Sequence, residues 1–142
     1  MDLSRAFPRS PKKKMAGLVQ LERMIDKGRA YKKNELADYI YPCPLDKIIL
    51  NFLRIEAGVF ANMTEEKSDD EIGSWAENIA KSKSPNEISF INEQILGRKP
   101  DSEDRLQYFN EIRDKIDPSR LDVTTWVDLL DLEEGRLPPK NS

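Results

Sequence analysis

The sequence predicts an all-α fold, a compact single-domain bundle of about six or seven helices. Apolar residues recur at steps of three and four along most of the chain, the spacing that puts them on one side of a helix. Serines followed three residues later by glutamate mark helix starts, and no alternating strand pattern runs beyond about four residues. A chain of 142 residues has the length of one ordinary domain and can bury a core without disulfides.

The predicted helices follow one another along the whole chain. They span about residues 12–33, 45–53, 55–63, 69–82, 85–97, 102–116 and 126–132. We expect Ser10 to cap the first helix and Pro11 to take its first position, because serine accepts a bond from an orphan N–H and proline has none to satisfy. Gly28 inside this helix indicates a close crossing with another part of the backbone.

Two prolines interrupt the helical pattern between the first and second helices. In Tyr41-Pro42-Cys43-Pro44 each proline disfavours the helical conformation of the residue before it. We therefore expect a short extended segment near Tyr39–Tyr41, after which Pro44 opens the second helix.

Capping chemistry locates the next two helix starts. Ser68 with Glu71, and Ser84 with Glu87, form two capping boxes, in which the hydroxyl and the carboxylate each accept a backbone N–H.

The expected organisation is a basic N-terminal arm at residues 1–11, a single helical domain at 12–135 and a flexible tail at 136–142.

The residue inventory excludes several classes of chemistry. There is no histidine, one cysteine (Cys43) and no glycine cluster, which excludes imidazole-based triads, an internal disulfide and phosphate-binding glycine loops. The sequence therefore predicts no metal, no cofactor and no catalytic residue, and it favours a non-catalytic protein over an enzyme. No apolar run reaches the length of a membrane span or of a signal peptide, so we expect a cytoplasmic protein without a membrane segment.

The net charge of −3 conceals a strong asymmetry. Residues 1–33 carry ten basic and three acidic side chains, a net +7, and residues 34–142 carry thirteen basic and twenty-three acidic ones, a net −10. One interpretation is that residues 1–33 bind an anionic partner or mediate self-association, as in a homodimer. The other, which the sequence alone favours, is that the basic segment lies on the acidic remainder of the same chain.

Two segments supply candidate ligand-binding residues. These are Arg23, Asp26, Lys27, Arg29, Tyr41, Cys43 and Asp46. On the first helix, two neighbouring cations hold Asp26 ionised, which suits a salt-bridge anchor. Cys43 falls at a helix N-terminus, where the helix dipole lowers a thiol pKa, but a free cysteine is more often a small buried hydrophobe. Asp46 is explained as an acid in the first turn of that helix.

The helix pair over residues 69–97 has the dimensions of a helix-turn-helix motif. Its second helix carries Glu87 and Glu93 and no lysine or arginine before Arg98, so DNA phosphates would repel it. We therefore expect an antiparallel helical hairpin and no specific DNA binding.

Six segments, in order, make the chain resemble a known bacterial family. They are Phe7-Pro8-Arg9-Ser10-Pro11, Arg23 to Ala30, Tyr41 to Asp46, Glu71-Ile72 with Trp75, Phe109-Asn110, and Trp126 to Leu132. The family is catalogued as domain of unknown function 5069, and the resemblance covers about Met1 to Leu132. It implies a bacterial, intracellular, single-domain protein and carries over no activity, cofactor or site. Many members of the resembled family carry Gly-Gly where this chain has Ala16-Gly17, and some carry a histidine near Gln20. This chain lacks that histidine and could not perform a reaction step that requires it.

Two functional hypotheses follow. The first is a non-catalytic helical binding module that holds a partner, or a second copy of the chain, through its basic N-terminal segment. The alternative is a small enzyme or ligand-binding protein whose pocket gathers Arg23, Asp26, Tyr41 and Asp46.

Overall fold

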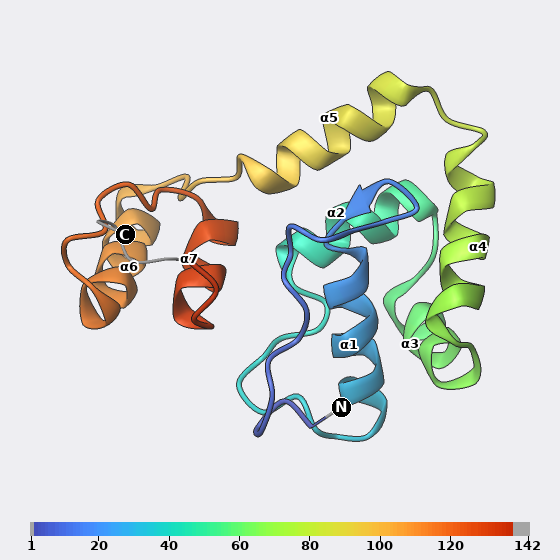
Figure 1. Cartoon of the computed structure of the whole chain (residues 1–142), viewed down its shortest axis with the longest axis horizontal. Coiled ribbons are helices and arrows are strands. Elements are labelled where there is room, and N and C mark those ends of the chain that lie inside the picture. The colour runs from blue at the N-terminus through green and yellow to red at the C-terminus, as the bar shows by residue number, and fades with distance from the viewer. Residues whose placement is uncertain (1, 138–142) are drawn as a thin grey trace. The chain divides into compact units, whose positions relative to one another are not determined.

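The computed structural model describes residues 2–137 and groups the chain into two compact units, Met1–Ile95 and Leu96–Ser142 (Figure 1). The all-α prediction is confirmed, because the described residues form seven helices and one hairpin of two-residue strands. The single domain over 12–135 stays a prediction, since each unit is described by itself. Most of the tail at 136–142 lies outside the described residues.

The first unit holds the hairpin and the first five helices. Their bounds are β1 (Lys14–Met15), β2 (Leu18–Val19), α1 (Leu21–Lys32), α2 (Pro44–Leu53), α3 (Ala57–Glu66), α4 (Asp69–Ala80) and α5 (Pro85–Leu96). The second unit, which begins at the last residue of α5, holds α6 (Glu103–Ile116) and α7 (Trp126–Glu133). No helix among the described residues is both long enough and apolar enough to span a membrane.

The predicted start of the first helix is wrong, because residues 14–19 form a hairpin. Lys14 pairs with Val19 across it, and the two turn residues Ala16 (φ 55°) and Gly17 (φ 78°) are both left-handed, as a type I′ turn requires. Gln20 (φ 71°) is left-handed as well and stands as the N-cap of α1. Three such residues within five positions exclude a continuous helix, and α1 begins only at Leu21.

Local chemistry places the other helix starts close to the prediction. Cys43 is the N-cap of α2 and Pro44 its first residue, and the carboxylate of Asp46 accepts the Cys43 N–H (3.0 Å). At the start of α4, Ser68 and Glu71 form both bonds of the predicted capping box. Tyr39 and Tyr41 are outside any helix, as expected for the segment before these prolines.

The core of the first unit forms around α1. Its largest fully buried apolar side chains are Leu18, Leu21, Met24, Ile25, Ile49, Phe60, Ile72 and Ile95. Gly28 lies where α1 meets α3, since a Cβ placed there would be 3.1 Å from Thr64 Cγ2 and 3.7 Å from the Cα of Ala61. The close crossing expected at Gly28 is therefore confirmed.

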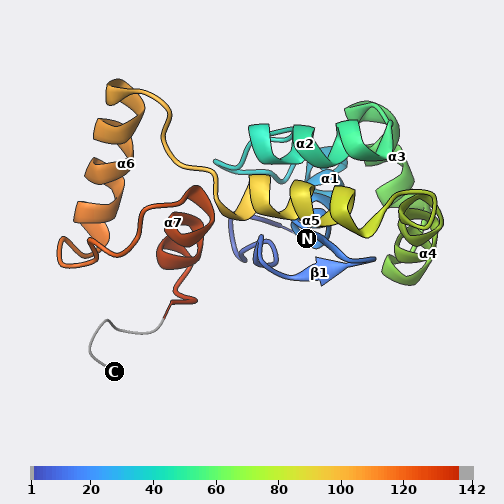
Figure 2. The ribbon, with the colours of Figure 1, turned by 90° about the horizontal axis from the view of Figure 1, so that it is seen from above.

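The N-terminal arm is packed rather than extended into solvent. Leu3 is buried and donates its N–H to the Glu35 carbonyl (3.0 Å), and Pro8 and Pro11 are buried too. The hairpin that follows is bonded to α5, because Asn92 accepts the Val19 N–H (3.0 Å) and donates to the Gly17 carbonyl (2.8 Å). Figure 2 shows the strand β1 passing alongside α5.

The second unit has its own small core. Phe109, Val123 and Leu129 are buried there, and Trp126 lies against Phe109 edge to face, with ring centres 5.1 Å apart. In the first unit, Trp75 similarly contacts Phe60.

Candidate functional site

Three of the predicted site residues meet at the junction of α1 and α2. The Lys27 Nζ lies 2.7 Å from Asp46 Oδ2 and 3.2 Å from Cys43 Sγ. The side chains of Lys27 and Asp46 are 4% and 0% exposed, so this ion pair is shielded from water. We call these residues the Lys27–Cys43–Asp46 cluster.

Gln20 belongs to the same cluster, and sequence reasoning missed its role. The Gln20 amide donates from Nε2 to Asp46 Oδ1 (2.8 Å), so both carboxylate oxygens are bonded. The Gln20 Oε1 is buried and has no hydrogen-bond partner within the described residues. The only signal in the sequence was the departure from the resembled family near this position, which gave no chemical role.

The cluster keeps the thiol of Cys43 protonated at neutral pH. Burial raises the pKa of Cys43, and the nearby Asp46 carboxylate raises it further, while Lys27 opposes both effects without cancelling them. This direction is opposite to the one that the helix N-terminus alone would give. Cys43 is therefore a poor nucleophile at rest.

Asp26 and Arg29 fall in a second group, organised by Arg9 of the N-terminal arm. The Arg9 guanidinium bonds Asp26 Oδ2 (3.1 Å), Glu22 Oε2 (2.8 Å) and Asp69 Oδ2 (2.9 Å). Arg29 completes the group with an ion pair to Asp69 Oδ1 (2.8 Å). We call this group the Arg9 clamp, and it ties the arm to α1 and α4. It also accounts for Asp26 as a salt-bridge anchor.

The two remaining predicted residues have structural partners. Arg23 is 2% exposed, donates to the Arg9 carbonyl (3.2 Å) and lies 5.5 Å from the centre of the Tyr39 ring. The Tyr41 O–H donates to the Ala57 carbonyl (2.6 Å), and burial raises the pKa of Tyr41 well above its ordinary value. Tyr41 is thus held as a neutral phenol.

A surface pocket of about 470 Å³ lies elsewhere in the first unit, between the hairpin and the α4–α5 corner. It is lined by Lys14, Gly17, Glu77, Ala80, Lys81, Lys83, Pro85, Ile88, Ser89 and Asn92. We call it the lysine pocket, after its three lysines. Asn92 fixes its shape, because the amide of that residue joins the hairpin to α5.

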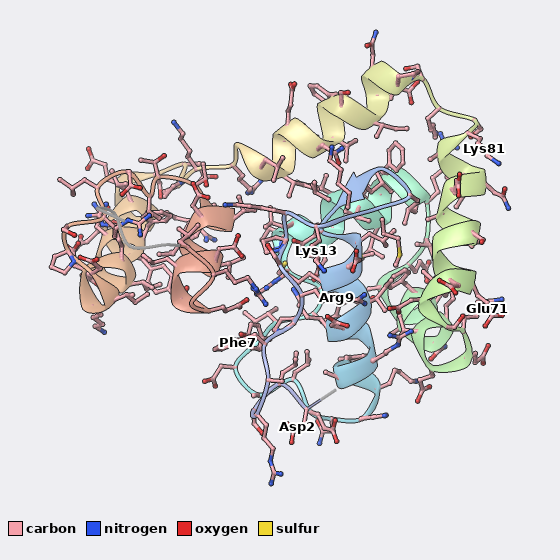
Figure 3. The ribbon with its side chains drawn as sticks, in the orientation of Figure 1. Asp2, Phe7, Arg9, Lys13, Glu71 and Lys81 are labelled. Atoms are coloured by element: carbon pink, nitrogen blue, oxygen red, sulfur yellow. The ribbon has the colours of Figure 1, made fainter. Side chains whose placement is uncertain are left out.

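The lysines of this pocket differ from Arg9, Lys27 and Arg29, which form ion pairs inside the first unit. Within residues 2–137, no ion pair is found for Lys14, Lys81 or Lys83, or for the neighbouring exposed Lys13. Lys83 lies 5.8 Å from the centre of the Phe52 ring, a cation–π contact. Figure 3 shows Lys81 and Glu71 near the two opposite ends of α4, and Arg9 beside α1.

The sequence does not predict the pocket, because its lysines are far apart in the chain. Lys14 belongs to the predicted basic segment, whereas Lys81 and Lys83 lie near the turn of the predicted helical hairpin. No group of three or more acidic or cysteine ligands suited to a metal ion is found among residues 2–137.

Comparison with known families gives a match over almost the whole chain. A family described as "Domain of unknown function (DUF5069)" matches residues 5–136. No curated protein matches the sequence.

Proposed function

The chain belongs to the family described as a domain of unknown function, DUF5069, and from its geometry we propose that it is a non-catalytic binding module. The lysine pocket takes an acidic segment of a partner protein. Lys14 of the basic N-terminal segment provides one of its charges, and the α4–α5 connection provides two more. The observation that carries the proposal is the gathering of three lysines without ion pairs around one pocket.

At least five of the ten basic side chains in residues 1–33 form ion pairs inside the first unit. Arg5, Arg9, Lys27, Arg29 and Lys32 each form an ion pair with a carboxylate of that unit. The unit as a whole carries fifteen basic and fifteen acidic side chains. The unit is therefore neutral overall, and among the pocket residues only Glu77 opposes the three lysines.

The composition of the pocket favours a protein partner over a nucleic acid. Single-stranded nucleic acid is usually held by aromatic rings on which bases stack, and no aromatic residue lines this pocket. Ala80, Pro85 and Ile88 give it an apolar floor instead. Lysines around an apolar floor suit a peptide that alternates acidic and aliphatic side chains.

The test is fluorescence anisotropy with a labelled peptide of alternating glutamate and leucine, measured over a salt series. We expect the triple variant Lys14→Ala, Lys81→Ala, Lys83→Ala to bind about tenfold more weakly at low salt, since three screened pairs at about 0.5 kcal/mol each sum to roughly one decade in Kd. The affinity of the unaltered protein should fall as salt rises.

A matched variant removes the same charge from another part of the surface. Lys33→Ala, Lys47→Ala, Lys67→Ala changes three exposed lysines outside the pocket. If the two triple variants lose affinity equally, the attraction is nonspecific and the pocket is not the binding site. If the unaltered protein binds a labelled oligonucleotide more tightly than the peptide, the choice of an acidic protein is wrong.

A second copy of the chain is one such partner, because residues 96–142 carry eight basic and eleven acidic side chains, a net −3. Light scattering over a dilution series tests this homodimer hypothesis with the same variants. A dimer that persists in the pocket variant would assign self-association to another surface.

The alternative, a small enzyme or ligand-binding protein, has weaker support. Its pocket would gather Arg23, Asp26, Tyr41 and Asp46, but the carboxylate of Asp26 is bonded to Arg9 and that of Asp46 to Lys27. None of the four residues lines the lysine pocket.

A further inference from the structure

We propose that Lys27 and Cys43 form a covalent sulfur–nitrogen crosslink when the protein meets hydrogen peroxide or an organic hydroperoxide. This modification site is separate from the lysine pocket and does not depend on the binding function. It joins α1 to the N-terminus of α2 through two side chains.

The geometry supplies both reacting atoms and an acid–base group. The Lys27 Nζ is 3.2 Å from Cys43 Sγ, a distance at which an amine can attack sulfur without a rearrangement of the backbone. Asp46 Oδ2 is 2.7 Å from the same nitrogen and can accept its proton. The residue Cys43 is partly exposed, and the reaction requires a small peroxide to reach its sulfur from solvent.

Gln20 adds a second observation to the same place. Its Nε2 holds the other oxygen of Asp46, and its buried Oε1 has no partner within the described residues. The cluster thus contains a spare hydrogen-bond acceptor beside the carboxylate. An N–H created or redirected by the reaction can therefore be satisfied without exposure to water.

The first step oxidises sulfur by two electrons. The Cys43 sulfur attacks one peroxide oxygen, the O–O bond breaks, and the products are a sulfenic acid and water, or an alcohol if the oxidant is an organic hydroperoxide. Sulfur in a sulfenic acid is electrophilic and condenses with nitrogen nucleophiles.

The second step is a condensation without further oxidation. The Lys27 ammonium gives one proton to Asp46, the nitrogen lone pair attacks the Cys43 sulfur, and the S–O bond breaks. The departing hydroxide takes a second proton from the same nitrogen and leaves as water. The products are a sulfenamide, one water and a protonated Asp46, and an external thiol reverses the bond by reduction.

The first step depends on pH because the thiolate is the form that attacks peroxide. Burial and Asp46 on α2 hold the pKa of Cys43 above its ordinary value, and Lys27 on α1 is the cation that opposes them. We therefore expect slow crosslinking at neutral pH and faster crosslinking as the pH rises toward 9.

The experiment treats the full-length protein with excess hydrogen peroxide and then measures its intact mass and its tryptic map. The crosslink lowers the mass by about 2 Da, whereas sulfenic and sulfinic acids raise it by about 16 and 32 Da. Because trypsin does not cleave after a modified lysine, the expected product is residues 24–29 joined to residues 34–47. Dithiothreitol should release the two peptides.

The controls separate the reaction from general oxidation. Lys47→Met removes an exposed lysine on α2 and should leave the crosslink unchanged, while Cys43→Ser and unfolding in urea should each abolish it. Lys27→Met should leave only oxidised cysteine, and if that variant does not fold, the map of the unaltered protein decides alone.

Three results would overturn the proposal. They are accumulation of sulfinic acid on Cys43 with Lys27 still cleaved by trypsin, a mass gain of about 14 Da from an oxygen-bridged product, and a thiol that stays unreacted at high pH.

Discussion

Removing the charge of Lys27 tests whether the buried ion pair with Asp46 stabilises the first unit. In Lys27→Met the aliphatic part of the side chain is kept, but the fully buried carboxylate loses its cation and retains only the bonds from Cys43 and Gln20. Deleting one partner of a buried pair destabilises a protein by about 3–5 kcal/mol, because the remaining charge is left without compensation. We expect a loss at the lower end, about 3 kcal/mol, since those two hydrogen bonds remain.

Urea unfolding followed by tryptophan fluorescence measures this loss. With a slope of about 1.5 kcal/mol per molar urea, the midpoint should fall by about 2 M. A Trp126→Phe background leaves Trp75 as the reporter of the first unit. The exposed Lys47→Met should change stability by less than about 0.5 kcal/mol. A loss below about 1 kcal/mol in Lys27→Met would refute the argument, because it would mean that water reaches Asp46.

Three further predictions concern the hairpin, the Arg9 clamp and the lysine pocket. Ala16→Gly should stabilise the protein by about 0.5–1 kcal/mol in thermal unfolding, because alanine is strained at a φ of 55°; a lower midpoint would show that no such strain exists. Burial of Asp69 opposes ionisation, but its bonds with Arg9 and Arg29 hold the pKa of that carboxyl below its ordinary value. The resulting stabilisation is present above the unfolded-state pKa of about 4 and is lost as the pH falls through the lower pKa of the folded state. Arg9→Gln should therefore make the free energy of unfolding depend less on pH in the acid range. An unchanged dependence on pH would contradict this. Glu77→Gln should tighten binding of the acidic peptide, because it removes the one negative charge of the pocket, and anisotropy showing no change would place the peptide elsewhere.

The parts of the fold that the sequence predicts well are those set by neighbouring residues. The capping box of Ser68 and Glu71 is such a case, as is the start of α2 at Pro44, because each depends on side chains within about one helical turn. The hairpin was missed for the converse reason. Leu18 and Leu21 fit the apolar spacing of a helix. Alanine and glutamine rarely adopt a left-handed conformation, so the presence of Ala16 and Gln20 does not predict one.

The candidate site divides in the same way. Cys43 and Asp46 were placed together because one helix cap holds both, and Lys27 joins them only through the packing of α1 on α2. Two features depend on contacts between distant segments. They are the ion pair of Arg9 with Asp69 and the position of Lys14 and Lys81 around one pocket. A charge count along the chain cannot reveal which cations are already bonded.

The Arg9 clamp has a consequence for the order of events during synthesis. Arg9 leaves the ribosome early, and Asp69 follows sixty residues later, when about half of the polypeptide has been made. Because N-terminal regions begin to fold first, the nascent chain passes through a stage in which the arm bears a cation that only Glu22 and Asp26 can engage. The arm gains its tie to α4 only once the start of that helix has emerged, so a translation pause before residue 69 would leave Arg9 with its partners on α1 alone.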